Sequence, residues 1–130
     1  MKIFKYGSAL GIAIFGMILM FTNGLYSGER PKSQFSTYQE AKESGLMTKG
    51  WIPTFIPRST TNISEQHDLD TNWVKMSFNY DPQDLAQTRE ACELELKLVN
   101  GKEFNCTYHG SSVKIKLYDN GEGTLYSASR

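Results

Sequence analysis

The densest group of side chains that could do chemistry lies between residues 65 and 72, in the stretch Glu-Gln-His-Asp-Leu-Asp-Thr-Asn. The polar side chains that could form a surface site are Glu65, His67, Asp68, Asp70 and Asn72. Asp68, Asp70 and Asn72 have the spacing that opens a calcium-binding loop. However, Trp73 stands where that loop needs a glycine, and Asn79 stands where it needs a bidentate glutamate. We therefore expect a hydrogen-bonded turn, with a polar contact surface as the alternative, and no metal or cofactor.

A hydrolase would have to use His67 or His109, because the chain has only two histidines. Ser111 and Ser112 follow His109 closely, but the chain has no Gly-x-Ser-x-Gly elbow, and neighbours at a turn seldom form a nucleophile and base pair. We expect no enzymatic activity. The rival hypothesis is a small envelope hydrolase or metal-dependent enzyme centred on His67, Asp68 and Asp70.

The two cysteines, Cys92 and Cys106, are candidates for a disulfide. A hairpin loop of residues 99–101 makes them diagonal neighbours about 7–8 Å apart, which exceeds comfortable disulfide reach. A bulge or an earlier strand start would bring them together. We expect a structural disulfide, with two buried thiols as the alternative; a redox role is not expected, because the chain has no Cys-x-x-Cys motif.

Three aromatic side chains, Trp51, Phe55 and Trp73, could line a contact surface. Trp51 and Phe55 lie among Pro53 and Pro57, and aromatic residues beside prolines more often seal a small core. A core role is therefore the first interpretation and a contact surface the second.

Charge excludes one class of partner. The chain has 14 basic and 14 acidic residues, so no global field would gather nucleic acid. Its 130 residues are enough for one domain and one targeting element. We therefore expect one domain that does not bind nucleic acid.

The N-terminus has the composition of a membrane anchor. Lys2 and Lys5 precede an apolar stretch, and residues 7–26 reach the length of about 20 residues that a bilayer requires. The small residues around positions 22–27 fit signal peptidase poorly, so we expect an uncleaved signal anchor, with cleavage as the alternative. The lysines favour a cytoplasmic N-terminus. This predicts a single-pass protein of the bacterial inner membrane, with its C-terminal domain periplasmic or otherwise extracytoplasmic.

The remaining elements must position the candidate residues. We expect an anchor at residues 1–26, a linker at 27–34 and a domain at 35–130. Within the domain, the sequence predicts short helices at 37–44 and 82–90, an edge strand at 60–67, a strand at 73–80 and an antiparallel meander from residue 92 onward. The expected fold class is α+β: an N-terminal transmembrane helix followed by a small domain with an antiparallel β-meander and two or three short helices.

Several short motifs resemble a group of small, uncharacterised bacterial envelope proteins. The motifs are Trp51-Ile52-Pro53, Ile56-Pro57, Asn62-Ile63 and His67-Asp68-Leu69-Asp70-Thr71-Asn72. Many proteins of that group look like lipoproteins or membrane-anchored proteins, although this chain lacks the cysteine that accepts a lipid. The resemblance implies a cell-envelope location and supplies no activity.

Taken together, these features predict a membrane-anchored extracytoplasmic interaction or accessory domain of the bacterial cell envelope. Its expected partners are the membrane, through residues 7–26, and a protein of the envelope. A more specific alternative is an immunity-type inhibitor that neutralises a toxin.

Overall fold

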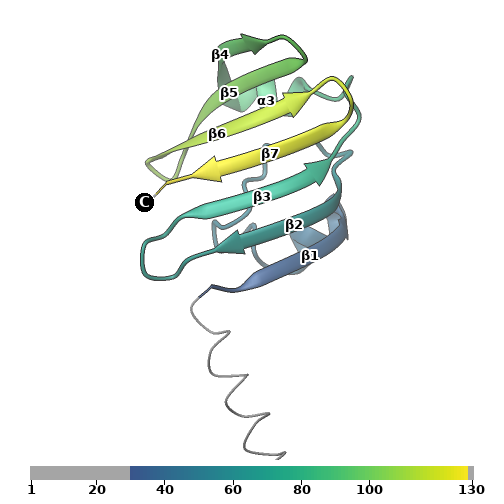
Figure 1. Ribbon diagram of the computed structural model, residues 1–130. Helices are drawn as coiled ribbons and strands as arrows, with labels where there is room; N and C mark the ends of the chain where they lie inside the picture. Colours follow the sequence, from purple (N-terminus) through teal and green to yellow (C-terminus); the bar gives the residue numbers. More distant parts are fainter. Residues whose placement is uncertain (1–29, 129–130) are drawn as a thin grey trace, which may run out of the picture. The chain divides into compact units, whose positions relative to one another are not determined.

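The computed structural model describes residues 30–128, which contain a seven-stranded antiparallel sheet and two short helices (Figure 1). Along the chain the elements are β1 (Lys32–Thr37), α2 (Tyr38–Glu43), β2 (Thr61–His67), β3 (Val74–Asn79), α3 (Ala86–Ala91), β4 (Cys92–Leu98), β5 (Gly101–Tyr108), β6 (Ser111–Tyr118) and β7 (Glu122–Ser127). The order of strands across the sheet is β1-β2-β3-β7-β6-β5-β4. Two runs of sequential strands therefore meet where β3 pairs with β7.

The expected α+β class was wrong, because the described residues are mostly antiparallel sheet, with 48% in strands and 12% in helices. Much of the difference comes from β1, which begins at Lys32 inside the expected linker. This strand pairs with β2 along its length, so β2 lies inside the sheet rather than at its edge. Residues 31–128 belong to one compact unit.

The membrane prediction is also corrected. Among residues 30–128, no helix is long and apolar enough to cross a membrane. The expected anchor at residues 1–26 lies outside the described residues. The expected single-pass location in the inner membrane, with its signal anchor and periplasmic domain, therefore has no support in the structure and is withdrawn.

One face of the sheet carries the hydrophobic core. Inward side chains alternate along each strand, as in Val74, Met76 and Phe78 of β3. Phe78 faces Gly123 across the β3–β7 pair, and a side chain at Gly123 would collide with the Phe78 ring. The core is closed by buried residues of α2 and of the connections between elements: Ala41, Met47, Ile52, Phe55, Ile56 and Leu85. In Figure 1 both helices lie behind the sheet, on the same side.

Local capping explains where the first helix begins. Thr37 accepts a hydrogen bond from the Glu40 amide at 3.2 Å, and the Glu40 carboxylate accepts one from the Ser36 amide at 2.7 Å. The first contact satisfies an amide that the first turn of a helix leaves without a partner, and the second ties the Glu40 side chain to the backbone just before the N-cap. The chain then turns through residues 44–50 and crosses the core as the proline-containing segment 51–60.

The disulfide between Cys92 and Cys106 is confirmed, but the hairpin register that we preferred was wrong. Leu98 pairs with Gly101, so only Val99 and Asn100 form the turn. A register shift between Leu94 and Leu96 then places Cys92 directly opposite Cys106, with their Cα atoms 4.4 Å apart. Because of this irregularity in β4, Cys92 and Phe104 can both face inward although the turn has only two residues.

Candidate functional site

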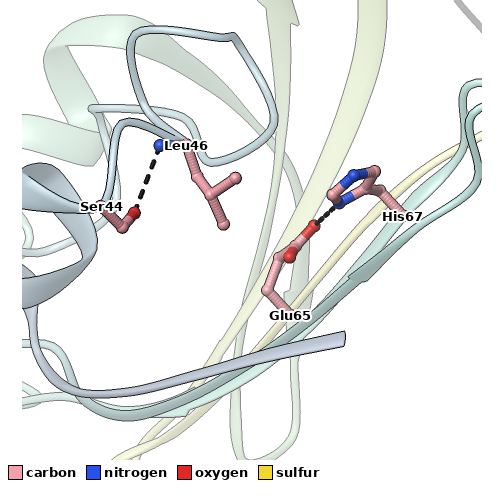
Figure 2. Close-up of polar contacts among 4 residues, drawn as sticks. All are labelled: Ser44, Leu46, Glu65 and His67. Atoms are coloured by element: carbon pink, nitrogen blue, oxygen red, sulfur yellow. Dashed lines mark hydrogen bonds and ion pairs between the residues drawn. The ribbon is translucent and has the colours of Figure 1, made fainter. Parts of the chain in front are cut away.

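A buried carboxylate and imidazole lie side by side on the inward face of β2. Glu65 and His67 are two residues apart on one strand, so their side chains point to the same side as Ile63. The Glu65 Oε1 and His67 Nδ1 atoms are 2.6 Å apart, and Figure 2 shows the carboxylate pointing to the imidazole ring. Glu65 is 2% exposed and His67 4% exposed. The two residues form what we call the buried Glu–His pair.

Trp51 covers this pair from the segment that crosses the core. Its ring stacks on the His67 ring with centroids 3.9 Å apart and planes inclined by 15°. The Trp51 amide donates a hydrogen bond to the Leu46 carbonyl at 2.9 Å, which holds the tryptophan at the end of the turn. Ser44 steadies the start of that turn, since its hydroxyl accepts a hydrogen bond from the Leu46 amide at 3.2 Å (Figure 2).

The electrostatics of the pair are set mainly by burial. Loss of water around Glu65 raises the pKa of its carboxyl, and the hydrogen bond and charge of His67 oppose that rise only in part. Within residues 30–128, the second carboxylate oxygen, Glu65 Oε2, has no hydrogen-bond partner. An unpaired acceptor in a core destabilises the fold.

The other polar candidates are not part of the buried Glu–His pair. The Asp68 carboxylate accepts hydrogen bonds from the Asp70 and Thr71 amides at 2.8 and 3.1 Å, so it caps the turn between β2 and β3. Asp68 is buried, Asp70 is exposed, and Asn72 is half-buried with a left-handed φ of 57°. Among the described residues, no group of three or more acidic, histidine or cysteine side chains is arranged to hold a metal ion.

The three aromatic candidates do not gather at one surface. Trp51 stacks on His67, whereas the buried Phe55 contacts the ring edge of Tyr108 with centroids 5.6 Å apart. Trp73 lies in the β2–β3 turn, where its carbonyl accepts a hydrogen bond from the Asp68 amide at 3.0 Å. Trp51 and Phe55 thus pack in the layer that covers the core.

The opposite face of the sheet carries an open groove of about 680 Å³. The charged and aromatic side chains on this face are Lys32, Lys75, Lys114, Lys116, Glu103 and Tyr126. Glu65 also borders the groove, but its side chain is buried on the covered face. The lysines are exposed, and Tyr126 is 52% exposed. We call this surface the open-face groove.

The strand register arranges the groove residues in two rows that run across the strands. The first row is Lys32, Gln66, Lys75, Tyr126 and Lys114, each a direct partner of the next. The second row is Ser64, Ser77, Thr124, Lys116 and Glu103. Lys116 Nζ and Glu103 Oε1 approach to 4.0 Å.

Reasoning from the sequence missed this groove. The alternation along β3 places Lys75 and Ser77 on the solvent side, but it does not show which strands lie beside them. Tyr126 and Lys114 join the first row only because β7 pairs with β3 and with β6. The pairing of β3 with β7 links residues about fifty positions apart in the chain, and no short motif signals it.

Comparison with known proteins gives one result for part of the chain. Residues 29–79 match the family model of the YbbD head domain. No curated protein matches the chain, and no solved structure does. The match covers less than half of the sequence, from before β1 to the end of β3, and it is consistent with a small accessory domain of unknown function. The matched part contains the buried Glu–His pair and contributes Lys32 and Lys75 to the open-face groove. Over residues 29–79, therefore, the chain is similar to the YbbD head domain.

Proposed function

We propose that the domain is a non-enzymatic accessory module that binds a partner protein through the open-face groove. The observation that supports this most strongly is the contrast between the two faces of the sheet. One face is closed by α2, the segment 44–60 and α3, whereas the other presents a hollow with exposed polar, cationic and aromatic side chains. A solvated sheet face needs no groove to be stable, so the hollow is the feature that suits a bound partner.

Within the same proposal, the buried Glu–His pair has a structural role. A general base must reach a substrate proton within about 2.6–3.2 Å, directly or through one water molecule. Both side chains of the pair are almost fully buried, and Trp51 stacks on the imidazole. We therefore assign the pair to holding the covering segment against β2 rather than to catalysis.

The experiment compares capture of a partner by three forms of the full chain. Thr124 lies in the second row of the open-face groove and is exposed, so Thr124→Trp should obstruct the hollow without disturbing the core. Thr107→Trp is the matched control, because Thr107 is exposed on β5 and does not line the groove. Tagged chains are recovered from the cells that produce the protein, and the thermal unfolding of each variant is measured in parallel.

The proposal predicts a stoichiometric partner that is captured by the wild-type chain and by Thr107→Trp, and that is lost with Thr124→Trp. Retention of the partner by a folded Thr124→Trp chain would contradict the assignment to the groove. Recovery of no partner with the wild-type chain would contradict the binding function itself.

A further inference from the structure

We infer that the open-face groove binds an extended, carboxylate-rich segment of its partner protein, aligned across the strands. This inference rests on the proposed function and adds the chemistry of the partner. The observations that support it are the charge and the spacing of the side chains in the two rows of the groove.

The groove is positively charged although the chain as a whole is neutral. Among the described residues, four lysines and two glutamates border the groove, and the side chain of one of these glutamates, Glu65, is buried on the covered face. The whole sequence, by contrast, balances 14 basic against 14 acidic residues. The excess is therefore local to one face of one sheet. A concave surface that carries one sign of charge attracts segments of the opposite sign and accelerates their association.

The lysines of the first row are regularly spaced. Lys75 and Lys114 flank Tyr126 as direct partners on either side, so they are two strands apart. Lys32 and Lys75 flank Gln66 in the same way. Neighbouring strands are about 4.8 Å apart, which gives about 10 Å between successive lysines of the row. An extended peptide that carries acidic side chains at short intervals fits this spacing, since lysine side chains are long and flexible.

The neutral side chains of the groove favour a polypeptide over a nucleic acid. Ser64, Ser77 and Thr124 of the second row and Gln66 of the first carry groups that both donate and accept hydrogen bonds. A peptide backbone needs both, whereas a phosphate backbone takes only donors. Within the part of the chain that the structure describes, Tyr126 is the single aromatic side chain that lines the groove. Surfaces that bind single-stranded nucleic acid usually stack several bases on several aromatic rings.

The test measures binding of poly-L-glutamate to the purified full chain at low and at moderate salt, with a single-stranded oligothymidine as the competing class. Lys75→Gln/Lys114→Gln removes the two charges beside Tyr126. Lys42→Gln/Lys49→Gln is the matched control, because both lysines are exposed and lie in α2 and the turn after it.

Poly-L-glutamate should bind the wild-type chain and the control equally and more tightly than oligothymidine does, with an affinity that falls as salt rises. Binding to Lys75→Gln/Lys114→Gln should be about tenfold weaker, because the variant loses two exposed ion pairs with the ligand. The inference is overturned by absence of binding, by equal binding to the groove variant, or by tighter binding of oligothymidine.

The two proposals fail separately in the capture experiment. Suppose that Thr124→Trp loses the partner and Lys75→Gln/Lys114→Gln retains it with wild-type affinity. This outcome would support binding at the groove and would contradict the inference that the bound segment is carboxylate-rich. If Thr124→Trp retains the partner, the proposed function fails first.

Discussion

Glu65 shows how a single buried side chain couples this fold to pH. Its carboxyl has one oxygen 2.6 Å from the His67 ring, while the other has no hydrogen-bond partner within the described residues. Burial raises the pKa of the carboxyl above its ordinary value of 4.5. The folded chain therefore holds this proton more tightly than the unfolded chain, and the contribution of Glu65 to stability is largest when the carboxyl is protonated.

The contribution of Glu65 to the free energy of unfolding should fall as pH rises from about 4.5 through the raised pKa. Glu65→Gln keeps an oxygen that can accept a hydrogen bond from His67 and cannot ionise, so it should lack this fall. Urea denaturation at a series of pH values then shows the variant gaining stability relative to the wild type as pH rises. An exposed carboxyl serves as the control, since Glu90→Gln should follow the wild-type profile. A stability difference between Glu65→Gln and wild type that does not change with pH would contradict the burial argument.

At the scale of elements, the edge strand β4 depends on its covalent link to β5. Leu94 and Leu96 are about half exposed, at 54% and 51%, so β4 buries little of its apolar surface. The disulfide closes a short loop between Cys92 and Cys106, which lowers the conformational entropy of the unfolded chain. For a loop of this length, the effect stabilises the fold by about 3 kcal/mol.

Cys92→Ser/Cys106→Ser should therefore lower the free energy of unfolding by about 3 kcal/mol. Chemical denaturation with and without a reductant measures this loss. The reductant should bring the wild-type chain close to the stability of the double variant and leave the variant unchanged. Equal stability of the wild type and the variant under oxidising conditions would show that β4 does not depend on the bond.

Elements with strong local signals were predictable from the sequence, and elements defined by distant pairing were not. The alternation of Val74, Met76 and Phe78 predicts β3, and the capping residues Thr37 and Glu40 predict a helix close to α2. By contrast, the segment of β1 is polar and resembles a linker, because a strand at the edge of a half-solvated sheet needs few apolar side chains. Its hydrogen bonds come from β2, which lies about thirty residues further along the chain.

The same distinction applies to the candidate site. Side chains along β2 alternate between the two faces of the sheet. Because Glu65 and His67 are two and four residues after Ile63, the alternation predicts that all three side chains lie on the same face. The stacking of Trp51 on His67 depends on the path of the covering segment, which no periodicity encodes. The register of β4 and β5 likewise depends on an irregularity between Leu94 and Leu96. The disulfide was therefore predictable from the two cysteines, whereas the pairing of residues between β4 and β5 was not.

For the whole molecule, we propose that a sheet closed on one face uses its other face to bind a partner. Residues 29–79, which match the YbbD head domain, supply β1 to β3 and part of the groove, and the C-terminal meander supplies the remainder. The open-face groove is therefore formed by both runs of strands and by the β3–β7 pairing that joins them.

Site-specific photo-crosslinking tests partner binding at this face, with a photoreactive residue placed at Thr124 in the groove or at Gln39 on α2. Gln39 is exposed and belongs to the layer that covers the other face, so it reports contacts on the wrong side of the sheet. A discrete crosslinked partner is expected from Thr124 in intact cells and none from Gln39. The same partner crosslinked from Gln39, with no product from Thr124, would place the binding surface on the covered side and contradict binding at the open-face groove.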